Sequence, residues 1–121
     1  MFVSPSLLPE SRSLAAAPLA AICADIEMLV AAAFAVPIED VRAPTRRSPR
    51  AAFARQCTIY LAHVCLGLGH RRLARLFRRD RTTARHACTV VEERRDDAAT
   101  DRTLQALEAA CAKLASARRA A

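Results

Sequence analysis

Apolar residues recur along this chain at the three- and four-residue spacing of amphipathic helices. The first stripe predicts a helix over residues 18–34, with Pro18 in its first turn and Val36-Pro37 beyond its end. Residues 37–41 can form one further helical turn. The expected buried positions of the first helix are Ile22, Ile26, Leu29, Val30 and Ala33.

Four more helices follow from capping signals and apolar spacing. Ser48 and Pro49 read as the N-cap and first residue of a helix over 49–65, which Gly67 and Gly69 end. A short helix is expected over 70–77, then a turn at 78–79, then a helix over 81–95 capped by Asp80. After a break at 96–100 the last helix covers 101–117. The expected apolar faces are Phe53, Cys57, Tyr60, Leu61 and Val64; Leu73, Leu76 and Phe77; Ala84, Ala87, Cys88 and Val91; and Leu104, Leu107, Ala110, Cys111 and Leu114.

Composition and length agree with this pattern. The chain has 121 residues, which suits one domain, and its low aromatic content of 4% with abundant Ala, Leu and Arg favours helices over sheets. We expect a disordered leader over residues 1–17 and one compact all-α domain of five to six helices over 18–118. Only two glycines occur and no P-loop motif is present, which excludes a P-loop ATPase.

Positive charge is concentrated in the middle of the chain. The formal net charge is +7, but residues 42–85 alone carry twelve arginines and one acid, Asp80. The first 41 residues have a net charge of −4, and residues 86–121 are neutral. Such segregation indicates a polyanionic partner, of which nucleic acid is the first candidate.

The cysteines and histidines give no sign of catalysis or of a bound cofactor. Five cysteines occur without a C-x-x-C motif, so we expect buried thiols in a reducing cytosol. A zinc site of Cys57, His63 and Cys65 can be imagined, but its spacing matches no ligand pattern, and no metal is predicted. We read His86 as structural. Without a Ser–His–Asp or paired-carboxylate arrangement, the chain is not expected to be an enzyme.

The segment from residue 70 to residue 85 has the layout of a helix-turn-helix. In that motif the N-terminal residues of the second helix reach base edges in the major groove. Arg81 and Arg85 can each bind a guanine, while Thr82 and Thr83 suit thymine. The plainer interpretation is a solvated arginine-rich helix end, but the acids that usually accompany surface arginines are missing from residues 42–79.

The motifs in this segment resemble those of the C-terminal domain (domain IV) of the bacterial replication initiator DnaA. That family shows a basic loop, an A-R-Q helix entry, a phenylalanine-containing helix and the signature G-R-D-H-T-T-V-x-H-A. Here Ala54-Arg55-Gln56 and Phe77 match the first elements, and residues 79–87 read R-D-R-T-T-A-R-H-A. The resemblance covers roughly residues 22–116 and implies a Trp-repressor-like helical fold. The signature histidine is Arg81 here, the preceding glycine pair is replaced, and the turn is one residue shorter.

The resemblance also assigns DNA contacts. Arg81, Thr82 and Thr83 occupy the positions that read the major groove, with Asp80 beside them and Arg85 further along. Arg55 and Gln56 match other DNA-touching positions, and Arg46 and Arg47 lie in the loop that reaches the minor groove. The expected DNA-binding set is Arg46, Arg47, Arg55, Gln56, Arg72, Arg79, Asp80, Arg81, Thr82, Thr83 and Arg85.

Two functions fit these features. In the first, a stand-alone box-reading domain, cytoplasmic and associated with the nucleoid, binds duplex DNA at DnaA-box-like or variant sites. It thereby modulates the initiation of chromosome replication. In the second, similar to HdaB-like proteins, the domain is a protein-interaction module that engages a DnaA-related regulator such as Hda, with weak or no specific DNA binding. Neither function requires a membrane or a small-molecule substrate.

Overall fold

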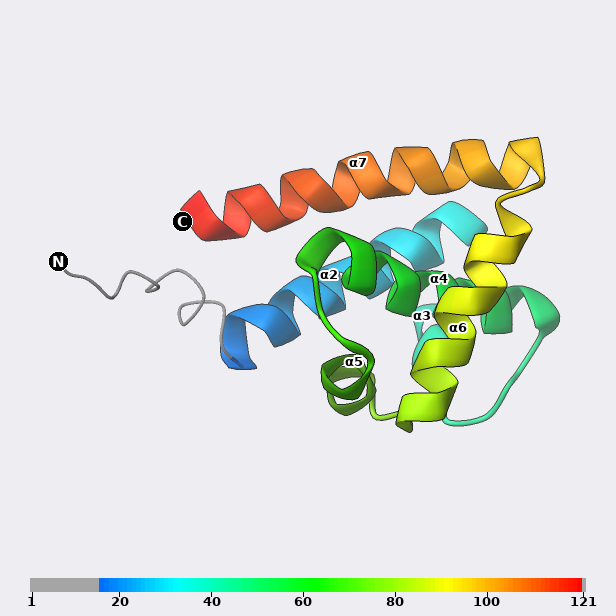
Figure 1. Cartoon of the computed structure of the whole chain (residues 1–121), viewed down its shortest axis with the longest axis horizontal. Coiled ribbons are helices and arrows are strands. Elements are labelled where there is room, and N and C mark those ends of the chain that lie inside the picture. The colour runs from blue at the N-terminus through cyan, green and yellow to red at the C-terminus, as the bar shows by residue number, and fades with distance from the viewer. Residues whose placement is uncertain (1–15, 121) are drawn as a thin grey trace, which may run out of the picture.

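The computed structural model describes residues 16–120, and within them the chain forms helices and no strand. The helices are α2 (Ala16–Phe34), α3 (Ile38–Arg42), α4 (Pro49–Leu66), α5 (His70–Phe77), α6 (Arg81–Arg94) and α7 (Ala98–Ala120), shown in Figure 1. The expected all-α fold is thus confirmed. The expected leader falls mostly outside the described residues, although residues 16 and 17 already belong to α2.

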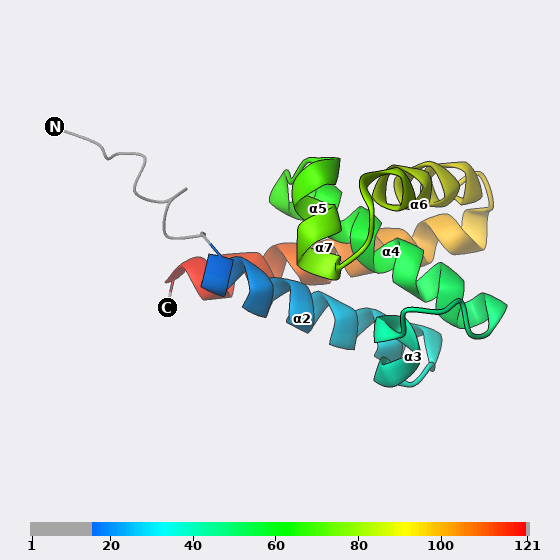
Figure 2. The same ribbon diagram turned by 90° about the horizontal axis from the view of Figure 1, so that it is seen from below.

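Helix α4 lies at the centre of the fold and contacts each of the other five helices. Nine of its residues are buried, including Phe53, Ile59 and Leu61. The long helices α2 and α7 lie side by side along one side of α4, and α5 and α6 pack on another (Figures 1 and 2). One contiguous core therefore holds all six helices in fixed relation.

Local capping signals set the ends of α4 as the sequence predicts. The Ser48 hydroxyl accepts a hydrogen bond from the Ala51 amide at 3.1 Å, and Pro49 occupies the first turn. Gly67 ends the helix with a φ of 67°, a left-handed conformation that glycine adopts without a side-chain clash. The chain reverses here and starts α5 three residues later.

The turn between α5 and α6 is short and contains no glycine. Arg78 adopts a left-handed conformation with a φ of 57°, and the Arg79 amide donates to the Ala74 carbonyl at 2.9 Å. Together with the longer Arg78-to-Arg75 bond, this is a Schellman motif. The Asp80 carboxylate then caps α6 by accepting from the Thr83 amide at 2.7 Å. Three residues thus separate the two helices.

The structure corrects two details of the expected helices. Val64 and Ala33, expected on apolar faces, are exposed, because the faces of α4 and α2 that meet the core do not extend to these positions. The last helix is longer than predicted and begins at Ala98. The Asp97 carboxylate caps it by accepting a hydrogen bond from the Thr100 amide at 2.9 Å, within the stretch that the sequence predicted to be a break.

Arg95 joins α7 to the rest of the molecule. Its guanidinium donates to Asp101 at 2.6 Å, to Glu108 at 2.7 Å and to the Tyr60 hydroxyl at 3.1 Å. The Glu108 bond is the largest of the contacts that hold the pKa of Arg95 above its ordinary range. Among the helices of residues 16–120, none combines the length and apolar character required to cross a bilayer.

Candidate nucleic-acid interface

Helix α5, the N-terminal end of α6 and the loop at residues 43–48 occupy one side of the molecule, the lower side in Figure 1. Figure 2, seen from below, shows all three facing the viewer. A hydrogen bond of 2.7 Å from Arg79 Nη2 to the Ala43 carbonyl links the turn of the helix-turn-helix to the start of this loop. We call this side, formed by residues 43–48 and 70–86, the basic face.

The N-terminal tip of α6 is the most prominent part of the basic face. Ala84, Ala87, Cys88 and Val91 are buried against the core. The remaining positions of the tip are therefore directed outward, and the four predicted base-reading residues are all exposed: Arg81, Thr82, Thr83 and Arg85. The free backbone N–H groups and the positive dipole end of α6 point in the same direction. The tip therefore presents donors and cations to solvent, and no element between residues 16 and 120 covers it.

The Asp80 carboxylate forms its hydrogen bonds within the protein, at the start of α6. Its hydrogen bonds with Thr83, backbone first, hold the pKa of the carboxyl below its ordinary value. The carboxylate is thus the form that α6 stabilises. This places Asp80 beside the reading residues, as predicted, with a local role as a helix cap.

The loop before α4 contributes the next part of the basic face. Arg46, Arg47 and Arg50 are exposed, and none of them forms an ion pair with a described acidic residue. Arg47 has a φ of 62°, so the backbone turns sharply at the middle of the loop. The loop therefore holds its guanidinium groups away from the core, as binding to a phosphate backbone requires.

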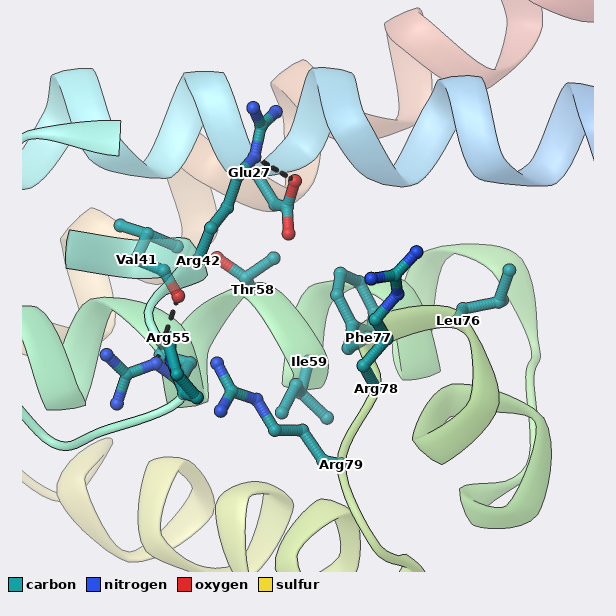
Figure 3. A pocket seen from close by; sticks show the side chains of 11 residues that line it. Glu27, Val41, Arg42, Arg55, Thr58, Ile59, Leu76, Phe77, Arg78 and Arg79 are labelled. Atoms are coloured by element: carbon teal, nitrogen blue, oxygen red, sulfur yellow. Dashed lines mark hydrogen bonds and ion pairs between the residues drawn. The ribbon is translucent and has the colours of Figure 1, made fainter. Parts of the chain in front are cut away.

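Arg55 and Arg79 are half-buried and bind backbone carbonyls instead of pointing into solvent. Arg55 donates to the Val41 carbonyl at 2.9 Å and to the Asp40 carbonyl at 2.5 Å. Figure 3 shows the two guanidinium groups near each other, along the edge of α4 that faces α6. Burial comes first among the causes that lower the pKa of each, and for Arg55 the charge of Arg79 follows. These two residues position the loop and the turn of the basic face.

A cavity of about 400 Å³ lies next to this arginine pair, between α3, α4 and the end of α5 (Figure 3). Its wall includes Arg55, Arg78 and Arg79, and the Arg79 Nε atom is buried with no hydrogen-bond partner among the described residues. On the far wall Glu27 pairs with Arg42 at 2.8 Å. Neither Arg55 nor Arg79 forms an ion pair within the described residues, so the wall that they form carries uncompensated positive charge.

The two remaining predicted residues lie apart from the α6 tip. Gln56 is half-buried on α4, next to Arg55. Arg72 is exposed on α5 and, with Arg75, lines a small hollow near Leu19 at the start of α2. Arg72 thus extends the basic face toward α2. The sequence prediction omitted four other exposed arginines. Their positions in the first turn of α4, on α5 and in the turn after α5 could have indicated them: Arg50, Arg71, Arg75 and Arg78.

The positive charge of the basic face is not compensated by ion pairs within the described residues. In residues 16–120 the ion pairs involve only Arg42, Arg95 and Arg118. The arginines from position 46 to position 85 therefore have no acidic partner within the described chain. Partial burial and the neighbouring His63 and Arg85 lower the pKa of His70, so the basic face disfavours a positive charge on this histidine.

The cysteines are mostly buried, as expected. Burial raises the pKa of Cys23 and of Cys57 to about 12, which keeps both thiols protonated. The set of Cys57, His63 and Cys65 is not brought together as a metal-binding group. The structure instead places His63, His70 and Cys88 close to one another. Linear spacing gave no signal for this cluster, because its members come from three helices.

A short helix, a three-residue turn and a second helix with an exposed cationic tip define a helix-turn-helix protein of the DNA-binding class. The sequence profile of the bacterial DnaA protein helix-turn-helix matches residues 23–91, more than half of the chain. The chain belongs to this family, whose domains bind duplex DNA. No curated protein matches the chain.

Proposed function

We propose that this protein binds duplex DNA with sequence preference and thereby modulates the initiation of chromosome replication. One observation carries the proposal: the tip of α6 exposes Arg81, Thr82, Thr83 and Arg85 together, at the end of a helix whose opposite side is locked into the core. A rigid helix that presents its first turn in this way is the arrangement that reads base edges in the major groove.

The exposed residue types determine which contacts are available. A guanidinium can donate two hydrogen bonds to the O6 and N7 atoms of guanine. Arg81 stands where the family signature has histidine, so we expect this protein to prefer guanine at the corresponding base. The target is then a variant of the DnaA box rather than the standard one.

The basic loop and α5 supply affinity rather than specificity. Arg46, Arg47 and Arg72 are exposed and form no ion pair with an acid in the described part of the chain, so their charges are available for DNA phosphates or a narrow minor groove. Each such contact releases counterions from the DNA, which makes binding weaken as the salt concentration rises.

The experiment is selection of preferred sites from random duplexes, followed by binding measurements on the selected site and a scrambled one. We expect Arg81→Ala and Thr82→Ala each to lower the discrimination between the two by about 1–3 kcal/mol. Arg46→Ala and Arg72→Ala should weaken binding to both duplexes alike and reduce the salt slope by about 1.

Arg102→Ala is a matched control, because Arg102 is exposed on α7, away from the basic face, and should leave binding unchanged. A selection that enriches no sequence at any salt concentration would contradict sequence preference. Replication control is tested separately, by comparing origin firing in cells that carry the wild-type protein or the Arg81→Ala variant.

A second candidate function rests on a different surface. An apolar groove runs between α2 and α7, and Met28 on its wall is 55% exposed. Its lining also includes the half-buried Leu29, Ala110 and Leu114, so Met28 belongs to a contiguous apolar surface. This groove favours docking of a protein, and a DnaA-related regulator such as Hda is the partner we propose.

The partner is tested by pull-down with purified Hda after nuclease treatment. Met28→Glu should abolish the association and leave DNA binding intact, while Arg81→Ala should do the reverse. An association that disappears with nuclease, or that Met28→Glu leaves unchanged, would rule out the groove as a docking site.

A further inference from the structure

Outside the base-reading tip, three side chains with metal-binding atoms converge where α4, α5 and α6 meet. His63 comes from the last turn of α4, His70 is the first residue of α5, and Cys88 is in the middle of α6. One ligand atom of each lies within 4.8 Å of the others. Among the described residues no other group of this kind is found.

The hydrogen bonding of His63 prepares it for this role. Its Nδ1 atom lies 2.6 Å from the Leu68 carbonyl oxygen. A carbonyl can only accept, so Nδ1 carries the proton and Nε2 keeps its lone pair. Histidines that bind metals are held in the same way, with the other ring nitrogen donating to a carbonyl or carboxylate.

The distances require only a small closure. Zinc bond lengths of about 2.0–2.3 Å in a tetrahedral site place the ligand atoms roughly 3.3–3.6 Å apart. Because no pair lies further apart than 4.8 Å, each pair closes by at most about 1.5 Å, within the reach of side-chain rotations. The His63 and His70 rings are now stacked, with centroids 4.9 Å apart and planes at 22°.

Metal binding has to break this stack, because the lone pair of an imidazole nitrogen lies in the plane of its ring. His63 is fixed by Leu68, whereas His70 is half-buried at the start of α5 and no hydrogen bond to its ring is found among the described residues. His70 is therefore the ligand that turns. Access from solvent is through the two imidazoles, since Cys88 itself is only 5% exposed.

We propose that His63, His70 and Cys88 form a binding site for a divalent transition metal, with Zn²⁺ as the ion that best matches two imidazoles and a thiolate. The thiol of Cys88 releases its proton to solvent as the sulfur binds the metal. Water fills the fourth position. The bound ion ties both helices of the helix-turn-helix to the end of α4, and so stiffens the support of the base-reading tip.

The test uses the full chain without DNA, so its outcome is independent of DNA binding. Cobalt(II) is titrated into reduced, metal-free protein while the visible bands of tetrahedral cobalt and the thiolate-to-cobalt charge-transfer band are recorded. Zn²⁺ is then added in competition. We expect one equivalent to bind and the midpoint of thermal unfolding to rise.

Cys88→Ala should remove the charge-transfer band, and both Cys88→Ala and His70→Ala should weaken binding at least about tenfold. The His70→Ala variant is expected to fold normally, because residue 70 lies outside the buried core, so weaker binding by this variant reports the loss of a ligand. The matched controls are Cys65→Ser, a half-buried thiol outside the cluster, and His86→Ala, an exposed histidine on α6; both should bind as wild type does. Failure of the wild-type protein to bind one equivalent would overturn the site, as would full binding by the Cys88 and His70 variants.

Discussion

Arg55 and Arg79 carry the same charge as the exposed arginines but act within the protein. Their guanidinium groups bind the carbonyls of Val41, Asp40 and Ala43, which belong to α3 and the start of the basic loop. The resemblance to the DnaA family assigned both to DNA. In this structure they hold the loop and the turn in place, so any effect on DNA acts partly through position.

Removal of Arg55 should therefore reduce stability as well as DNA binding. We expect Arg55→Ala to lower the free energy of unfolding by about 1–2 kcal/mol, because the backbone carbonyls of Val41 and Asp40 lose a charged hydrogen-bond donor. Arg46→Ala, at an exposed position, should change it by less than about 0.5 kcal/mol. Urea denaturation measures both; equal stabilities for the two variants would contradict the positioning role.

Arg78 carries backbone strain where the family signature has glycine. Its φ of 57° costs a non-glycine residue roughly 1 kcal/mol. We expect Arg78→Gly to raise the free energy of unfolding by about this amount relative to Arg78→Ala, since both variants remove the same charge and only glycine relieves the strain. Thermal and urea unfolding of the pair provide the measurement. A glycine variant no more stable than the alanine variant would show that the turn is not strained.

At the scale of the element, α6 depends on its first turn. The Asp80 carboxylate caps the helix in its charged form, and its pKa is lowered in the folded protein. A lowered pKa means that the folded state gains stability above the ordinary pKa of the group and loses it as the pH falls through the folded value.

We therefore expect the stabilisation from Asp80 to be complete at neutral pH and to decline below about pH 4. Asp80→Asn keeps a capping oxygen that does not titrate in this range. The difference in unfolding midpoint between wild type and Asp80→Asn should shrink or reverse between pH 7 and pH 3. If the unfolding midpoints of the two proteins changed with pH in parallel, the charge of Asp80 would not contribute to the stability of the folded state.

Helix starts were the most predictable elements, and helix faces were less so. Ser48 and Asp80 cap α4 and α6 as the sequence indicates, because a cap involves only neighbouring residues. Val64 fits the apolar spacing of α4 but is 43% exposed. Which part of a helical stripe is covered depends on where the neighbouring helix ends, and local spacing does not contain that information.

At the scale of the whole molecule, Arg95 connects three helices at the far end from the basic face. It donates to Tyr60 on α4 and to Asp101 and Glu108 on α7. Acids and arginines alternate around Arg95, a pattern typical of a solvated helix end. Its three partners on α4 and α7, of which Tyr60 lies 35 residues away in sequence, show a structural role instead.

We expect Arg95→Ala to lower the free energy of unfolding by about 1–3 kcal/mol, because three hydrogen bonds to a charged donor are lost at once. Arg102 is an exposed arginine on α7, and Arg102→Ala should change the free energy of unfolding by less than about 0.5 kcal/mol. Urea denaturation of both variants tests this, and a small effect at Arg95 would show that the network is solvent-screened.

The sequence alone determined the helical class, the capped ends of α4 and α6 and the charge of the middle third, since each depends on composition or on residues within a few positions. The tertiary structure decided which arginines point outward and which bind backbone carbonyls. It also brought His63, His70 and Cys88 together. These features depend on how distant helices pack, because burial and mutual distance are fixed only when every helix has found its neighbours.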